Sequence, residues 1–217
     1  MNPRTQRSAL AGPAGAIECA IDHPAEGPPR GLAVLCHPHP LHGGTLDNKV
    51  VQTMARSLVQ LGYTSVRFNF RGIGASQGQW DEGRGEVDDA LAVVAAHRLA
   101  GQALVLGGFS FGGYVASKAA ARLGADGPER LVLVGPAVVS FSMAPVPPDT
   151  LVVHGELDEV VPLAAVFNWA RPQPLPVVVV PGSGHFFHGQ LPLLKQIITG
   201  AWAARAAQAP QTTFAAT

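Results

Sequence analysis

The sequence predicts an α/β fold with a mostly parallel, doubly wound sheet that is flanked by helices on both faces. Short apolar runs without interruption recur along the chain, which is typical of strands buried on both faces, because a sheet exposed on one face would alternate apolar and polar residues. Segments with apolar residues at helical spacing alternate with these runs. A length of 217 residues suffices for one domain with one substantial core.

Two strand–helix pairs are expected in the first half of the chain. Residues 32–36 form a continuous apolar run, and residues 48–61 show helical spacing, with Asp47 or Thr45 as the candidate N-cap. Residues 63–70 are the next expected strand, which ends in a glycine-rich turn. Residues 85–99 then predict a helix with an acidic first turn.

The second half continues the same alternation. We expect a strand at 103–107, a helix at 111–123, three further buried strands at 131–134, 150–153 and 177–180, and a last helix at about 192–206. Residues 135–149 contain four prolines and are too short for a separate lid domain. We therefore expect a single domain at 1–207 and a flexible C-terminal tail at 208–217.

Composition narrows the functional classes. Lys plus Arg equals Asp plus Glu at 15 each, and no basic run is present, so we expect no nucleic-acid partner. No export signal and no apolar stretch of membrane-spanning length is evident, so we expect no membrane association and a cytoplasmic location. Cys36 is the last residue of an apolar run, and its thiol is best explained as a small buried side chain.

The strongest local motif is the G-x-S-x-G match at 108–112, which lies between an expected strand and an alanine-rich helix. A serine nucleophile must stand clear of the sheet on a tight turn, and the flanking glycines provide the space for it. We predict Ser110 as the nucleophile. The N–H of Phe111, at the start of the helix, can donate to a developing oxyanion. The alternative is a glycine-rich turn with an incidental N-cap serine.

A serine hydroxyl needs a base within hydrogen-bond reach, usually a histidine oriented by a carboxylate. Asp158 follows the strand expected at 150–153, and His185 follows the valine strand, so both lie where catalytic groups collect in a parallel sheet. We predict these two as acid and base. Glu156 and Glu159 compete with Asp158, and His188 competes with His185.

The order Ser, Asp, His, each just after an expected strand, resembles the α/β-hydrolase superfamily. The segments 37–45, 48–51, 68–76 and 154–158 are similar to its compact, lidless bacterial subgroup of dienelactone-hydrolase-like and esterase-like proteins. The resemblance implies a second oxyanion donor, the N–H of His39, with Leu41 as the fallback. Dienelactone hydrolases themselves use a cysteine nucleophile, so their substrate does not carry over to a chain with serine at that position.

We therefore expect a serine hydrolase that cleaves small carboxylic esters or thioesters through an acyl-enzyme and needs no cofactor. Its partner would be a small-molecule ester, and a homodimer stays open. The residues expected at the substrate are Phe109, Leu41, Phe186 and Met143.

Other functions remain open at this point. The same triad could serve peptidase, thioesterase, acyltransferase or lyase chemistry, or the fold could be that of a non-catalytic binding protein. A metal-dependent hydrolase could be built on His37, His39 and His42, but no cysteine or carboxylate pattern completes a ligand set, and a turn that hydrogen-bonds its own backbone explains these residues adequately. We predict no metal site.

Overall fold

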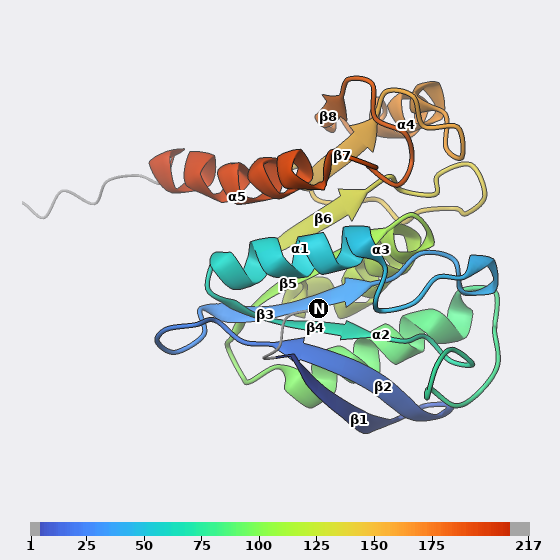
Figure 1. Cartoon of the computed structure of the whole chain (residues 1–217), viewed down its shortest axis with the longest axis vertical. Coiled ribbons are helices and arrows are strands. Elements are labelled where there is room, and N and C mark those ends of the chain that lie inside the picture. Colours follow the sequence, from blue (N-terminus) through green and yellow to red (C-terminus); the bar gives the residue numbers. More distant parts are fainter. Residues whose placement is uncertain (1–4, 209–217) are drawn as a thin grey trace, which may run out of the picture.

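A computed structural model describes residues 5–208 and folds them around one eight-stranded sheet (Figure 1). The strand order is β1-β2-β4-β3-β5-β6-β7-β8, and β3 to β8 run parallel to one another. The predicted mostly parallel α/β sheet is thereby confirmed. The strands are β1 (Gln6–Gly12), β2 (Gly15–Asp22), β3 (Gly31–Cys36), β4 (Tyr63–Phe68), β5 (Ala103–Phe109), β6 (Arg130–Val134), β7 (Leu151–Gly155) and β8 (Val177–Val180).

Helices cover both faces of this sheet. In Figure 1, α1 and α5 lie on one face, and α2 and α3 lie on the other. Each face holds its own apolar core, one packed against α1 and α5 and the other against α2 and α3. The helices are α1 (Lys49–Gln60), α2 (Arg84–His97), α3 (Phe111–Leu123), α4 (Leu163–Ala170) and α5 (Leu191–Gln208), with short 3-10 turns at Pro40–His42 and Gly124–Asp126.

The helices pack through apolar stripes. Val50, Met54 and Leu58 recur at four-residue spacing along α1, and all three are buried against the sheet. Leu194 and Ile198 of α5 pack into the same core. Helical periodicity in the sequence therefore identifies the face that meets the sheet.

The N-terminal hairpin of β1 and β2 was not expected from the sequence. β2 alternates buried and partly exposed residues, and β1 is largely exposed, so neither gives the uninterrupted apolar run of a buried strand. The hairpin joins the sheet through antiparallel pairing of β2 with β4. The two antiparallel pairings of the sheet, β1 with β2 and β2 with β4, both involve β2, the one described strand that runs opposite to the others.

Two expectations were wrong in detail. β8 is an edge strand rather than a buried one, and the side chain of Val178 is 37% exposed there. The N-cap of α1 is Asn48 instead of Asp47 or Thr45, because Oδ1 of Asn48 accepts hydrogen bonds from the N–H groups of Val50 and Val51 at 2.9 and 3.3 Å. Helix α4 was not predicted.

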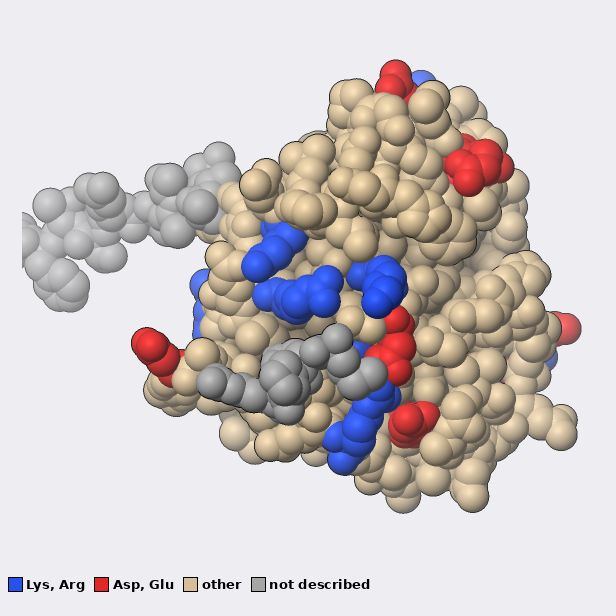
Figure 2. Space-filling view, viewed as in Figure 1, with Lys and Arg blue, Asp and Glu red and all other residues tan. Residues whose placement is uncertain are grey.

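Asp47 has a different role, as part of an ion-pair network. Its carboxylate lies 2.6 Å from the Arg7 guanidinium and 3.3 Å from that of Arg67, which also pairs with Asp22 at 3.0 Å. Arg67 is buried, so its charge requires these partners. Figure 2 shows acidic side chains beside basic ones on this face. The network ties the hairpin to the segment that leads into α1.

The segment 135–150 between β6 and β7 contains no helix or strand, as expected from its prolines, and no inserted domain, as expected from its short length. The predicted tail lies outside the described residues except for Gln208, the last residue of α5. Among the described residues, no helix combines the length and apolar character needed to span a membrane.

We predict that β6 and β8 respond very differently to substitution. Leu133→Ala removes a fully buried side chain from β6 and should lower the free energy of unfolding by about 2–5 kcal/mol. Val178→Thr, on the edge strand, should change it by no more than about 0.5 kcal/mol. Urea denaturation of both variants measures the difference, and equal losses would contradict the assignment of β8 as an exposed edge.

Candidate active site

Ser110 occupies the single residue between β5 and α3. Its φ is 54° and its ψ is −117°, a left-handed conformation that costs a non-glycine residue on the order of 1–3 kcal/mol. Three backbone hydrogen bonds hold the turn: Ser110 N–H donates to the Val134 carbonyl, and the N–H groups of Gly113 and Ala137 donate to the Ser110 carbonyl. The surrounding structure therefore overdetermines the position of this serine.

The glycines of the motif are required by close backbone approach. A Cβ on Gly108 would lie 2.1 Å from the backbone of Gly112, and a Cβ on Gly112 would lie 2.2 Å from the carbonyl oxygen of Cys36. Both distances are far below any tolerable contact. The motif thus lets the end of β3 and the start of α3 pack directly against each other beside Ser110.

Asp158 and His185 form a buried hydrogen-bonded pair. Oδ2 of Asp158 lies 2.7 Å from Nδ1 of His185, and Oδ1 accepts from the N–H groups of Val160 and Val161 at 2.9 and 2.7 Å. Burial alone would raise the pKa of Asp158, but the hydrogen bonds from His185 and Val161 and the nearby imidazoles outweigh it and lower that pKa below its usual value. The carboxylate is therefore ionised at neutral pH.

The ionised carboxylate defines the tautomer of His185. A carboxylate only accepts hydrogen bonds, so Nδ1 of His185 carries the proton and Nε2 is left as a base. The residues that compete with Asp158 and His185 in the sequence lie outside this pair. Glu156 accepts from the N–H of Gly182, and Glu159 and His188 are exposed.

Ser110 and His185 line one pocket of about 240 Å³ at the carboxyl edge of the sheet. Val160 and Phe186 form its apolar part, and the side chains of His39, His42 and Asn48 supply polar surface. The full lining is Pro38, His39, His42, Gly43, Gly44, Asn48, Ser110, Val160, His185 and Phe186. The pocket therefore places a hydroxyl, an imidazole base and the loop after β3 around one small volume.

His37 shapes that loop. Its Nδ1 donates to the Pro38 carbonyl at 2.7 Å, and its Nε2 accepts from the N–H of Phe70 at 3.1 Å. The Pro38 carbonyl and the His39 N–H belong to one peptide plane, so this hydrogen bond orients the N–H predicted as an oxyanion donor. Both ring nitrogens of His37 are thus used by the backbone, as the turn interpretation expects, and neither offers a lone pair to a metal ion.

Of the four residues expected at the substrate, only Phe186 lines the pocket. Phe109 is fully buried, and its ring packs 4.8 Å from that of His185. Leu41 is 64% exposed on the same loop as the pocket, outside its lining. Met143 packs against the α2/α3 core, with its sulfur 4.0 Å from the Ser117 hydroxyl. Periodicity cannot tell which aromatic of a loop or strand end turns inward.

Sequence reasoning missed two of the polar lining residues. The sequence pattern associates His42 with a backbone turn or a metal site, whereas in the structure this residue lines the pocket and its ring stacks on that of His39 at 4.4 Å. Asn48 was placed inside a helix, although it caps α1 and faces the pocket as well. The cluster of polar residues between 37 and 48 was the available signal for both.

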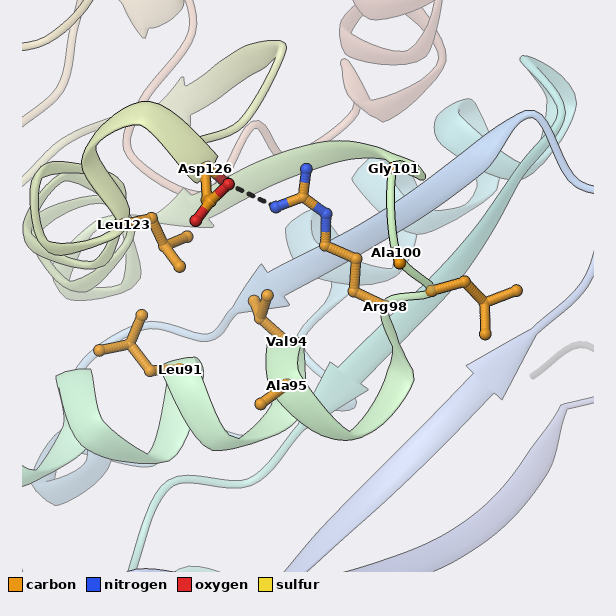
Figure 3. A pocket seen from close by; sticks show the side chains of 9 residues that line it. Leu91, Val94, Ala95, Arg98, Ala100, Gly101, Leu123 and Asp126 are labelled. Carbon is orange, nitrogen blue, oxygen red and sulfur yellow. Dashed lines mark hydrogen bonds between the residues drawn. The ribbon is translucent and has the colours of Figure 1, made fainter.

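A larger cavity of about 490 Å³ lies at the opposite edge of the sheet, where residues 98–101 lead into β5 (Figure 3). Leu91, Val94 and Leu123 surround it, and Arg98 donates to the carbonyl of Asp126. No serine, cysteine or histidine lines this cavity. The smaller pocket is therefore the better candidate for an active site.

Residues 27–172 match the family model described as serine aminopeptidase, S33. The chain belongs to this family. Among solved structures of α/β serine hydrolases, the protein without a lid from Xanthomonas campestris is 37% identical, with a TM-score of 0.85 over 94% of this chain and 96% of that one. A homologue from Coxiella burnetii is 39% identical, with a TM-score of 0.78 over 90% of this chain and 96% of that one.

A protein of Rickettsia prowazekii, whose function is uncharacterised, is 37% identical over 161 residues. This match spans 69% of the present chain and 66% of that relative. The family match and the two solved structures confirm the resemblance to lidless bacterial α/β serine hydrolases. The chain therefore has the α/β fold of the serine hydrolase family to which it belongs.

We predict a pH dependence of stability that originates at His37. Burial lowers the pKa of its imidazole from 6.5 to about 4, although the Pro38 carbonyl partly offsets that effect. Below pH 6.5 the His37 imidazole is protonated in the unfolded chain but stays neutral in the folded chain. The free energy of unfolding that this residue contributes above pH 6.5 is therefore lost as pH falls toward 4. We expect a loss of about 2–3 kcal/mol from this residue between pH 7 and pH 4.

Urea denaturation at several pH values measures this loss. His37→Asn serves as the control, because it retains a short donor toward the Pro38 carbonyl but cannot titrate. Its free energy of unfolding should fall less steeply over the same pH range. Parallel curves for the variant and the wild type would show that another group is responsible.

Proposed function

We propose that this chain hydrolyses small carboxylic esters or thioesters through Ser110, His185 and Asp158. The observation that carries the proposal is the buried Asp158–His185 hydrogen bond at the pocket that Ser110 also lines. It gives His185 the tautomer required of a general base, with the free nitrogen turned away from the carboxylate. Family membership supports the same reaction class.

In the proposed reaction, Oγ of Ser110 attacks the substrate carbonyl while Nε2 of His185 takes the hydroxyl proton. The N–H groups of Phe111 and His39 hold the oxyanion. Phe111 is the first residue of α3, so its N–H has no partner within the helix. The imidazolium returns its proton to the leaving group, and a water molecule activated by His185 then releases the acid from Ser110.

The pocket favours esters with a small acyl group. Its volume of about 240 Å³ lies below the roughly 300–1,000 Å³ of sites for drug-sized ligands. Its lining contains no Asp or Glu and no Lys or Arg. An uncharged acyl group fits such a site without leaving a charge unpaired.

Peptidase chemistry is the second candidate, because the family description names a serine aminopeptidase. An aminopeptidase must recognise the free α-ammonium group of its substrate, for which a carboxylate is the natural partner. The residues that line the pocket include no carboxylate, so we favour the ester. Matched kinetics on p-nitrophenyl butyrate and alanine p-nitroanilide separate the two, and faster turnover of the anilide would favour the peptidase.

We predict that a fluorophosphonate probe labels the wild type and that Ser110→Ala abolishes labelling. Asp158→Asn should lower kcat by about 10⁴-fold, because the amide favours the wrong tautomer of His185. Gel fluorescence measures the labelling, and ester hydrolysis measures kcat. Ser140→Ala, at an exposed serine, is the matched control and should retain full labelling. Label that persists in Ser110→Ala would contradict the assignment, and an unlabelled, inactive wild type would favour a non-catalytic binding protein.

We predict that Phe186 contributes to substrate binding and that Met143 does not. Phe186→Ala should raise KM for a phenyl ester roughly fivefold, equivalent to about 1 kcal/mol, because part of this apolar wall is already exposed to water. Met143→Ala should leave KM unchanged, since its side chain packs outside the pocket. Steady-state kinetics of both variants test this, and the opposite pattern would place the substrate on the other side of Ser110.

A further inference from the structure

A second imidazole lies behind the acid of the proposed triad. His154 is near the end of β7 and is fully buried. Its Nε2 lies 2.8 Å from the Val161 carbonyl and 3.4 Å from Oδ2 of Asp158. That oxygen is the one that contacts Nδ1 of His185 at 2.7 Å. One carboxylate oxygen of Asp158 therefore faces two histidines.

The contacts of His154 define its tautomer. A carbonyl oxygen only accepts hydrogen bonds, so Nε2 must carry the proton that faces Val161. Nδ1 is buried and has no hydrogen-bond partner among the residues that the structure describes. Burial lowers the pKa of this imidazole, although the Val161 carbonyl and Asp158 raise it in part, so the ring is neutral at neutral pH.

His154 is linked to the Asp158 carboxylate through the backbone of Val161. The N–H of Val161 donates to Oδ1 of Asp158, while the carbonyl of the same residue accepts from His154. The ring thus connects the rigid strand β7 to the turn that carries the carboxylate. Without this connection, the Asp158 carboxylate would rely on the loop alone for its orientation toward His185.

We propose that His154 is a positioning residue, a neutral N–H donor that fixes the Asp158 carboxylate so that its Oδ2 meets Nδ1 of His185. The inference rests on the proposed function, because it assigns His154 to the same triad. The remaining interpretation is a core histidine that contributes only to folding. The two differ in kinetics, since a folding role affects the amount of active protein and a positioning role affects kcat of the folded protein with little change in KM.

The experiment compares two substitutions in the full chain. His154→Leu keeps an apolar side chain of similar bulk but removes the donor. His154→Gln keeps an amide N–H near the position of Nε2 and carries no charge. We expect His154→Leu to lower kcat for p-nitrophenyl acetate by about 10- to 100-fold with KM little changed, and His154→Gln to restore kcat to within about fivefold of the wild type. Rates of fluorophosphonate labelling should follow the same order.

Several outcomes overturn the proposal. A His154→Leu variant with wild-type kcat and labelling rate shows that the N–H donor is dispensable. Equal losses of kcat in His154→Leu and His154→Gln show that the effect of residue 154 does not come from its N–H group. If His154→Leu does not fold, as judged by circular dichroism, His154→Asn replaces it, because its shorter amide cannot reach the position of Nε2. His23→Leu, at a surface histidine, controls for a general effect.

The failure of the proposed function is recognised separately. If the wild type itself takes up no probe and cleaves no ester, the triad is not a serine hydrolase site, and the role of His154 fails with it. If the wild type is labelled and the His154 variants behave alike, the hydrolase assignment stands and only the positioning role is wrong.

Discussion

The site depends on a single buried hydrogen bond between loops that follow neighbouring parallel strands. Asp158 and His185 come after β7 and β8, whose pairing brings the two loops together at one edge of the sheet. The loops are locked further by a hydrogen bond of 2.8 Å from the Leu157 N–H to the Ser183 carbonyl. Gly155 permits this approach, because a Cβ there would lie 2.4 Å from the same carbonyl oxygen. A buried carboxylate is costly unless it is fully hydrogen-bonded, so this region tolerates few alternative arrangements.

The remaining parts of the site follow from the same topology. β3 pairs with β5 in a register that sets Cys36 beside Gly108, so the loop after β3 and the turn at Ser110 start from adjacent points. The strained backbone of Ser110 is stabilised by three hydrogen bonds, from its N–H to Val134 of β6 and to its carbonyl from Gly113 and Ala137. The buried His37 orients the Pro38–His39 peptide, which carries the N–H proposed as the second oxyanion donor. Rigid strands thereby deliver each group to one edge of the sheet.

Most of the fold and the core of the site could be predicted from the sequence, since both depend on patterns of adjacent residues. Uninterrupted apolar runs identify β3, β5 and β6, and the triad candidates follow from their places after strands. The hairpin of β1 and β2 escaped prediction because its burial is partial, and β8 was misjudged because four valines look alike at an edge and in the middle of a sheet. Neighbours in space decide those cases.

The direction of side chains limited the prediction of the site in the same way. Phe109 and Phe186 are both aromatic residues next to catalytic candidates, but only tertiary packing shows that the first fills the core beside His185 and the second faces the pocket. The role of His154 is similarly hidden, because its partner carbonyl at Val161 is seven residues away in the sequence. Such contacts depend on loop conformation, which no local pattern specifies.

The neutral histidines around the site have a common electrostatic consequence. Burial lowers the pKa of both His37 and His154, so these imidazoles act as hydrogen-bond donors and acceptors without carrying charge. In the proposed reaction, His185 becomes an imidazolium during proton transfer from Ser110, and Asp158 must stabilise this charge. A second cation beside Oδ2 would compete for that carboxylate and repel the imidazolium at a separation of a few ångströms. A neutral His154 contributes its hydrogen bond without this repulsion, so orientation of the acid and stabilisation of the base do not conflict.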